Sequence, residues 1–108
     1  MELSESDKII AREIIEKGLQ IEYGNNLKKV SAIIKDWEVQ MNNRETQYKL
    51  YRRMIKFEKH ISQRYEGVTG SKYLFVIAAQ YVDEIIDKTD LERLSTEAQQ
   101  AIEKIIAI

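Results

Sequence analysis

The chain has 108 residues, of which 44% are hydrophobic and 32% are charged, and its formal net charge is −1. This length suits one hydrophobic core and is too short for two, and the composition excludes a disordered or fibrous protein. The absence of cysteine excludes disulfides, thiolate metal sites and a cysteine nucleophile.

The first predicted helix begins near Ser6, a residue type that caps helices by accepting a hydrogen bond from a backbone N–H. Gly18 lies on its apolar face, where the missing side chain lets another helix approach closely. Gly24, followed by Asn25 and Asn26, predicts the end of this helix, because glycine suits the residue just after a helix. The core face consists of Ile10, Ile14 and Ile21.

A second helix is expected next, with apolar residues at alternating spacings of three and four positions. They are Leu27, Val30, Ile34, Trp37 and Met41. Asn42 and Glu45 have the spacing of a capping box, which predicts a break at Asn42–Asn43. An unbroken long helix is the alternative at this point.

The third predicted helix spans residues 44–66 and carries seven basic and three acidic residues, a net charge of +4. At about 100° per residue, six of the basic side chains fall within one sector of about 140°. The other side of the helix is apolar, with Phe57 in its core stripe. The basic sector consists of Lys49, Arg52, Arg53, Lys56, Lys59 and Arg64.

Residues 67–70 form the clearest predicted loop, because both ends are glycine. A fourth helix is expected from Ser71, and residues 73–79 are apolar on nearly every side, which is typical of a central helix. A strand within this apolar run is the competing interpretation, but the sequence offers it no partner strand. Backbone amides at the start of the helix, with Lys72 and Arg64, could bind a phosphate; a plain loop is the alternative.

Two capping patterns follow toward the C-terminus. Thr89 with Glu92 predicts a short capped turn, and Thr96 with Gln99 predicts the start of a final apolar helix. Four main helices joined by short loops imply antiparallel neighbours. The predicted fold is an all-α, up-and-down antiparallel helical bundle in a single domain, residues 1–108, with the short turn and a C-terminal helix packed against four main helices.

No catalytic apparatus is predicted. His60, the single histidine, has no metal-ligating neighbour one helical turn away. Two carboxylate pairs are spaced like Glu-x-x-Glu and Glu-x-x-Asp: Glu13 with Glu16, and Glu84 with Asp87. They are similar in residue type to the magnesium ligands of all-α nucleotide pyrophosphatases, a resemblance that implies a metal-dependent enzyme. Because all four residues fall on polar helix sectors, we expect a solvated acidic surface, no metal and no cofactor.

The basic sector permits three interpretations. It could bind nucleic acid through its phosphates, with Tyr48 and Tyr51 as bordering stacking surfaces. It could pair with the ends of the same chain, since residues 1–24 and 67–108 each carry a net charge of −3. It could also meet an acidic protein partner or a second copy. A sequence pI near 5.9 favours a protein contact over nucleic acid.

Some apolar residues fall outside the predicted core stripes, and three of them give the first helix a second apolar side, which indicates more than one neighbour. They are Ile9, Leu19, Tyr23, Val39 and Val76. We therefore expect a non-enzymatic protein that acts through protein–protein interaction or as a homo-oligomer, with nucleic-acid binding as the alternative. The expected binding residues are Lys49, Arg52, Arg53, Lys56, Lys59, Arg64 and Lys72.

Charged residues near the N-terminus interrupt any signal-peptide core, and every uncharged run is shorter than the roughly 18 to 20 residues of a membrane span. The absence of cysteine is compatible with a reducing compartment. We expect a cytoplasmic protein without membrane contact.

Overall fold

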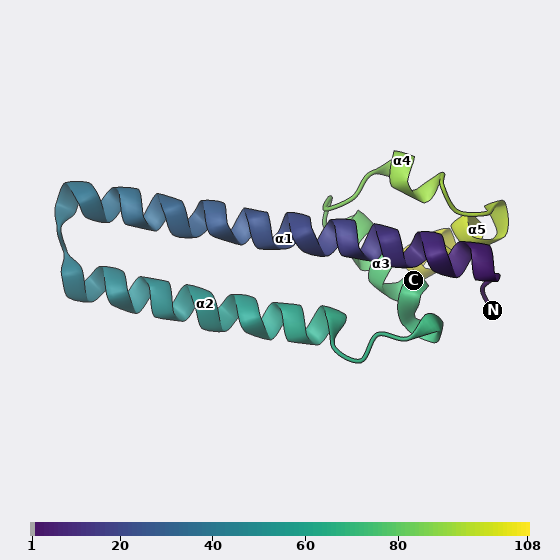
Figure 1. Cartoon of the computed structure of the whole chain (residues 1–108), viewed down its shortest axis with the longest axis horizontal. Coiled ribbons are helices and arrows are strands. Elements are labelled where there is room, and N and C mark those ends of the chain that lie inside the picture. Colours follow the sequence, from purple (N-terminus) through teal and green to yellow (C-terminus); the bar gives the residue numbers. More distant parts are fainter. Residues whose placement is uncertain (1) are drawn as a thin grey trace. The chain divides into compact units, whose positions relative to one another are not determined.

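A computed structural model describes residues 2–108. This part of the chain forms helices and connections without a strand, so the predicted all-α helical bundle is confirmed and the strand interpretation is wrong. The chain divides into a compact unit, residues 2–21 with 67–108, and a hairpin, residues 22–66. The elements are α1 (Glu5–Gln40), α2 (Asn43–Tyr65), the 3₁₀ turn η1 (Gly70–Lys72), α3 (Tyr73–Val82), α4 (Lys88–Leu91) and α5 (Thr96–Ala107) (Figure 1).

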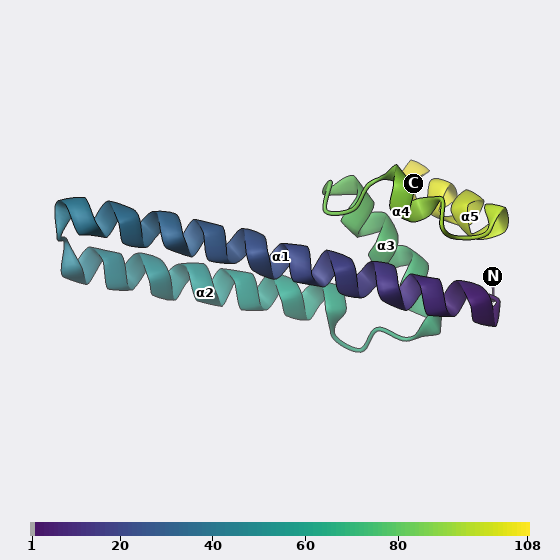
Figure 2. The ribbon, with the colours of Figure 1, turned by 45° about the horizontal axis from the view of Figure 1, so that its top comes forward.

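Helix α1 is uninterrupted and contains both of the first two predicted helices (Figure 2). The predicted end at Gly24–Asn26 is therefore wrong. Gly24 keeps a helical conformation, at a cost of about 1 kcal/mol relative to alanine. Asn26 does not start a new turn, because its side chain is buried and bonded to α2. Contacts made by the whole helix thus outweigh the local preference for a break.

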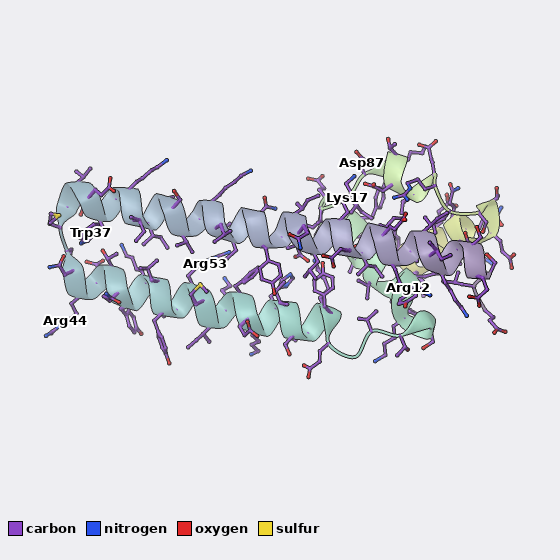
Figure 3. All side chains as sticks on the ribbon, in the orientation of Figure 1. Arg12, Lys17, Trp37, Arg44, Arg53 and Asp87 are labelled. Carbon is purple, nitrogen blue, oxygen red and sulfur yellow. The ribbon has the colours of Figure 1, made fainter. Side chains whose placement is uncertain are left out.

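The predicted break at Asn42–Asn43 is confirmed. Met41 adopts a left-handed backbone conformation, with a φ of 56°, and α2 begins at Asn43. The predicted capping box is wrong, because the Asn42 side chain donates to the Glu45 carboxylate and makes no cap hydrogen bond. Trp37 lies at this end of α1 (Figure 3), and its Nε1 donates to Asn43 Oδ1 over 2.7 Å. This bond ties the start of α2 to the end of α1.

Helix starts in the compact unit differ by one or two residues from the prediction. Ser4, rather than Ser6, accepts a hydrogen bond from the Asp7 N–H over 3.1 Å at the start of α1. Ser95, rather than Thr96, caps α5, and both its N–H and its hydroxyl donate to the Asp7 carboxylate. Because Asp7 is buried, these bonds satisfy its carboxylate and hold the first turn of α1 against the start of α5.

Helix α3 occupies the centre of the compact unit, as its apolar sequence predicts, and packs against α5. Val76 is 6% exposed, so the prediction that it lies outside the core is wrong. A helix with neighbours on several sides buries residues that a single stripe does not include. The apolar core cluster comprises Leu3, Ala11, Ile14, Leu74, Ile77, Ala78, Ile86, Leu94, Ala98 and Ile102.

Gly18 of α1 faces the fully buried side chain of Gln80 in α3. A Cβ atom at Gly18 would lie 2.2 Å from Gln80 Nε2, inside the contact distance of real atoms. Gln80 Nε2 in turn donates to the Ile15 carbonyl of α1 over 3.1 Å. The predicted close approach at Gly18 is confirmed, and the missing side chain is what allows this interhelical hydrogen bond.

Candidate functional site

The second half of α1 and helix α2 run antiparallel and form the hairpin (Figure 1). Within residues 22–66, Phe57 is the single buried apolar residue, and its ring meets that of Tyr23 edge-on, with 5.3 Å between the centroids. Val30 and Leu50 are half-buried. Two helices enclose little apolar volume, because each leaves most of its circumference in water. The hairpin by itself therefore has a thin core.

Polar side chains cross-link one flank of the hairpin. Asn26 Oδ1 accepts a hydrogen bond from Arg53 Nε over 2.9 Å. Arg53 lies between the two helices (Figure 3) and is half-buried. A guanidinium fixed in this way keeps further N–H donors for other groups.

Glu22 is the centre of a second polar cluster on this flank and is 7% exposed. Its Oε1 lies 2.6 Å from His60 Nε2 and 3.1 Å from Arg64 Nη1, and Tyr65 donates its hydroxyl to the other oxygen. The sequence did not reveal this cluster, because the four residues become neighbours through the pairing of two helices. His60 is thus a partner of a buried carboxylate.

Five of the seven predicted binding residues line one open groove on the hairpin, with a volume of about 610 Å³. Arg52, Lys56 and Lys59 are exposed and make no ion pair within residues 2–108. Lys49 pairs with Glu45 over 3.4 Å in an exposed contact of small energetic value. This basic groove is lined by Ile33, Lys49, Arg52, Arg53, Ile55, Lys56 and Lys59.

The other two predicted binding residues lie outside the basic groove. The Arg64 side chain is 14% exposed and pairs with Glu22, so its charge is neutralised within the hairpin. Lys72 lies in η1 of the compact unit, where a single 3₁₀ turn precedes α3 in place of the helix start expected at Ser71. Pairing within the chain, one of the three interpretations, therefore holds at Arg64, whereas Arg52, Lys56 and Lys59 form no ion pair with any residue that the structure describes.

The flank of the hairpin turned away from Arg53 carries several apolar side chains, and one of them, Met54, lies with its Sδ 4.0 Å from Asn26 Nδ2. Asn26 lies four positions before Val30 in α1, and Arg53 lies four positions before Phe57 in α2. Val30 and Phe57 mark the sides on which the two helices face each other. Leu27 and Met54 each follow Asn26 and Arg53 by one residue. Their side chains are therefore turned about 100° around the helix axis from those of Asn26 and Arg53. We define the apolar face as Leu27, Ile34, Tyr51, Met54 and Ile61.

Large parts of the apolar face are accessible to solvent. Leu27 and Tyr51 are each 64% exposed and Met54 is 53% exposed, whereas Ile34 and Ile61 are half-buried. Single exposed apolar residues are ordinary in soluble proteins, but a group on one flank marks an interaction surface. Leu27 and Met54 belong to predicted core stripes, so the sequence identified their apolar role without showing that they stay exposed.

Charge is sorted between the two units. The hairpin carries ten basic and six acidic residues, a net charge of +4. The rest of the chain carries seven basic and twelve acidic residues, a net charge of −5. The hairpin is therefore basic although the whole chain has a formal charge of −1. The pI of the whole chain does not describe the charge of the hairpin surface.

Three of the four carboxylates in the predicted acidic pairs have structural partners in the compact unit. Glu13 binds Arg93, Glu16 accepts from Gln20 over 3.0 Å, and Asp87 caps α4. Within residues 2–108, no group of three or more His, Cys, Asp or Glu is arranged to hold a metal ion.

Asp90 is the centre of the polar contacts around α4 and is 4% exposed. It forms a capping box with Asp87, in place of the predicted cap by Thr89 with Glu92. Lys17 Nζ of α1 donates to Asp90 Oδ1 over 2.7 Å. Burial raises the pKa of Asp90, but the hydrogen bonds from Lys17 and Asp87 and the charge of Lys17 outweigh it, so its pKa lies below the ordinary value.

We expect the lowered pKa of Asp90 to make the compact unit sensitive to acid. A carboxylate with a lowered folded-state pKa adds stability that is present above its unfolded pKa, about 3.9, and is lost as pH falls through the folded value. Asp90→Asn should lower the unfolding free energy at pH 7 by about 1–2 kcal/mol and flatten its decline below about pH 4. Urea unfolding at several pH values measures this; Glu92→Gln, an exposed change, is the control. An unchanged acid dependence in Asp90→Asn would contradict the assignment.

These features define an all-α protein with a two-faced helical hairpin, basic on one flank and apolar on the other. Comparison with protein families, with curated proteins and with solved structures finds no match for this chain. In the part that the structure describes, no helix has both the length and the apolar character needed to cross a membrane.

Proposed function

We propose that this chain acts by binding rather than catalysis, as a helical protein that associates with a second copy of itself through the apolar face of the hairpin. The observation that carries the proposal is the exposure of Leu27 and Met54 on the same flank. A second hairpin on this face would complete a four-helix arrangement with a shared core, which two helices cannot form alone. The lack of cysteine supports a reducing, cytoplasmic setting.

The size of the apolar face suits a dimer of moderate affinity. Residues 22–40 of α1 rise by about 28 Å, and two packed helices are about 20 Å wide, so the face covers on the order of 560 Å² per copy. Two copies would bury about 1,100 Å², just above the roughly 1,000 Å² expected of a specific interface. We therefore expect association at micromolar concentrations rather than an obligate dimer.

The dimer should depend on the apolar face and not on apolar exposure in general. We expect Leu27→Gln combined with Met54→Gln to abolish association, because it places two amides in the proposed core. Val39→Gln is the matched control, since Val39 is 83% exposed and lies on the α1 surface turned away from Val30. Sedimentation equilibrium measures the association, and circular dichroism verifies that helix content is kept. Equal loss of association in both variants would refute this face as the interface.

A further inference from the structure

We propose that the basic groove of the hairpin binds single-stranded nucleic acid, with phosphates on its cations and a base on the exposed ring of Tyr48. This site is separate from the apolar face, so its success or failure does not depend on self-association. The proposal depends on three observations: the lack of internal ion pairs at Arg52, Lys56 and Lys59, the predominance of Lys and Arg among the lining residues, and an aromatic ring at the rim.

The cations of the groove are available for an external anion. Arg52, Lys56 and Lys59 are exposed and have no ion pair within residues 2–108. Lys49 to Lys59 spans about 15 Å along α2, which is a row of charge rather than a single point. Arg53 is oriented by Asn26, which reduces the entropy that its side chain would lose on binding. The row suits an extended polyanion.

Five of the seven residues that line the groove are Lys or Arg, and two are Ile. Ile33 is half-buried, and Ile55, which is 50% exposed, is the one largely exposed apolar residue that lines it. An amphipathic acidic helix would find one largely exposed apolar side chain there, whereas the apolar face of the hairpin supplies several. Electrostatic attraction is therefore the main recognition available, and it is the term that dominates sequence-independent nucleic-acid binding.

Tyr48 distinguishes a single strand from a duplex as the ligand. Its side chain is 60% exposed at the edge of the groove, and the Arg52 guanidinium lies 5.6 Å from its ring centroid. Aromatic rings beside backbone-binding cations form stacking platforms for unpaired bases, which a duplex does not present. The pI of the whole chain argues against nucleic-acid binding, but the hairpin that carries the groove has a net charge of +4, as nucleic-acid binding requires.

The test measures fluorescence anisotropy of a labelled 20-nucleotide single strand of mixed sequence with the full chain, from about 50 to 200 mM salt. Five phosphate contacts predict a slope of log affinity against log salt near −3.5. Lys56→Gln with Lys59→Gln should reduce the magnitude of the slope by about 1.4 and weaken binding at low salt about tenfold or more. Lys88→Gln with Lys104→Gln removes equal charge from exposed residues of the compact unit and should change little.

Stacking is tested at Tyr48 alone. We expect Tyr48→Ala to weaken single-strand binding about tenfold without changing the salt slope, and Tyr48→Phe to retain binding. The absence of an anisotropy change at about 100 µM protein and 50 mM salt would overturn the proposal. Equal losses in the two lysine double variants would overturn the site. Equal affinity for a duplex would overturn the single-strand assignment. Full competition by polyglutamate at matched charge, together with no effect of Tyr48→Ala, would also overturn it and would indicate a surface for polyanions in general or for acidic proteins.

Discussion

Replacement of Gly18 by alanine should destabilise the compact unit, although alanine is the better helix former. The new methyl group would lie 2.2 Å from Gln80 Nε2 and 2.6 Å from its Cδ, and Gln80 is fully buried. Relief requires Gln80 to move and give up its bond to the Ile15 carbonyl. We expect overpacking of this kind to lower the free energy of unfolding by about 1–3 kcal/mol. Urea unfolding followed by circular dichroism measures the loss.

Gly24 provides the matched control, because it lies in the same helix with nothing within 4 Å of an added Cβ. Gly24→Ala should raise the unfolding free energy by about 0.5–1 kcal/mol through helix propensity and reduced freedom of the unfolded chain. The two variants should therefore shift stability in opposite directions. A Gly18→Ala protein as stable as Gly24→Ala would show that α1 and α3 do not approach closely at this point.

Replacement of Glu22 by glutamine should destabilise the hairpin. The variant keeps the side-chain volume but removes the negative charge that faces Arg64, whose side chain is 14% exposed, and His60. Because the variant replaces a buried, charge-assisted contact by a neutral one, we expect the free energy of unfolding to fall by about 2–3 kcal/mol. The fluorescence of Trp37, the single tryptophan of the chain, reports on the hairpin during denaturation.

Glu58→Gln is the control for this change, because Glu58 is exposed on α2 and its loss should alter stability by less than about 0.5 kcal/mol. The comparison separates the contacts of Glu22 from the general effect of removing one negative charge. If both variants unfold at the same urea concentration as the wild-type chain, the cluster around Glu22 contributes nothing to the hairpin.

The sequence predicts the helical class and most turns because periodicity and glycine placement are local signals. It places the turn at Asn42–Asn43 and the close approach at Gly18 correctly. It is wrong at Gly24–Asn26, where a local breaker is overridden by the contacts of α1 with α2. Cap positions at Ser95 and Asp87 also differ, because several neighbouring Ser, Thr and Asp residues can cap and packing selects among them.

The candidate site was partly visible in the sequence. Helical periodicity groups the five cations of residues 49–59, and the structure brings all five to one groove. Periodicity could not show that Arg64 is neutralised by Glu22, because that contact joins residues far apart in the chain. It also could not show that Leu27 and Met54 remain exposed, since an apolar stripe has the same pattern whether its partner is in the same chain or in another. The oligomeric expectation, the binding residues and the single-domain expectation for residues 1–108 stay predictions.

Self-association through the apolar face is the central claim, and the mass of the wild-type chain in solution tests it most directly. Sedimentation equilibrium from about 5 to 500 µM should show the average mass rising from that of one chain toward that of two, as a micromolar dissociation constant requires. The rise should persist at high salt, because apolar burial is not screened. A mass that stays at one chain throughout this range would contradict the account.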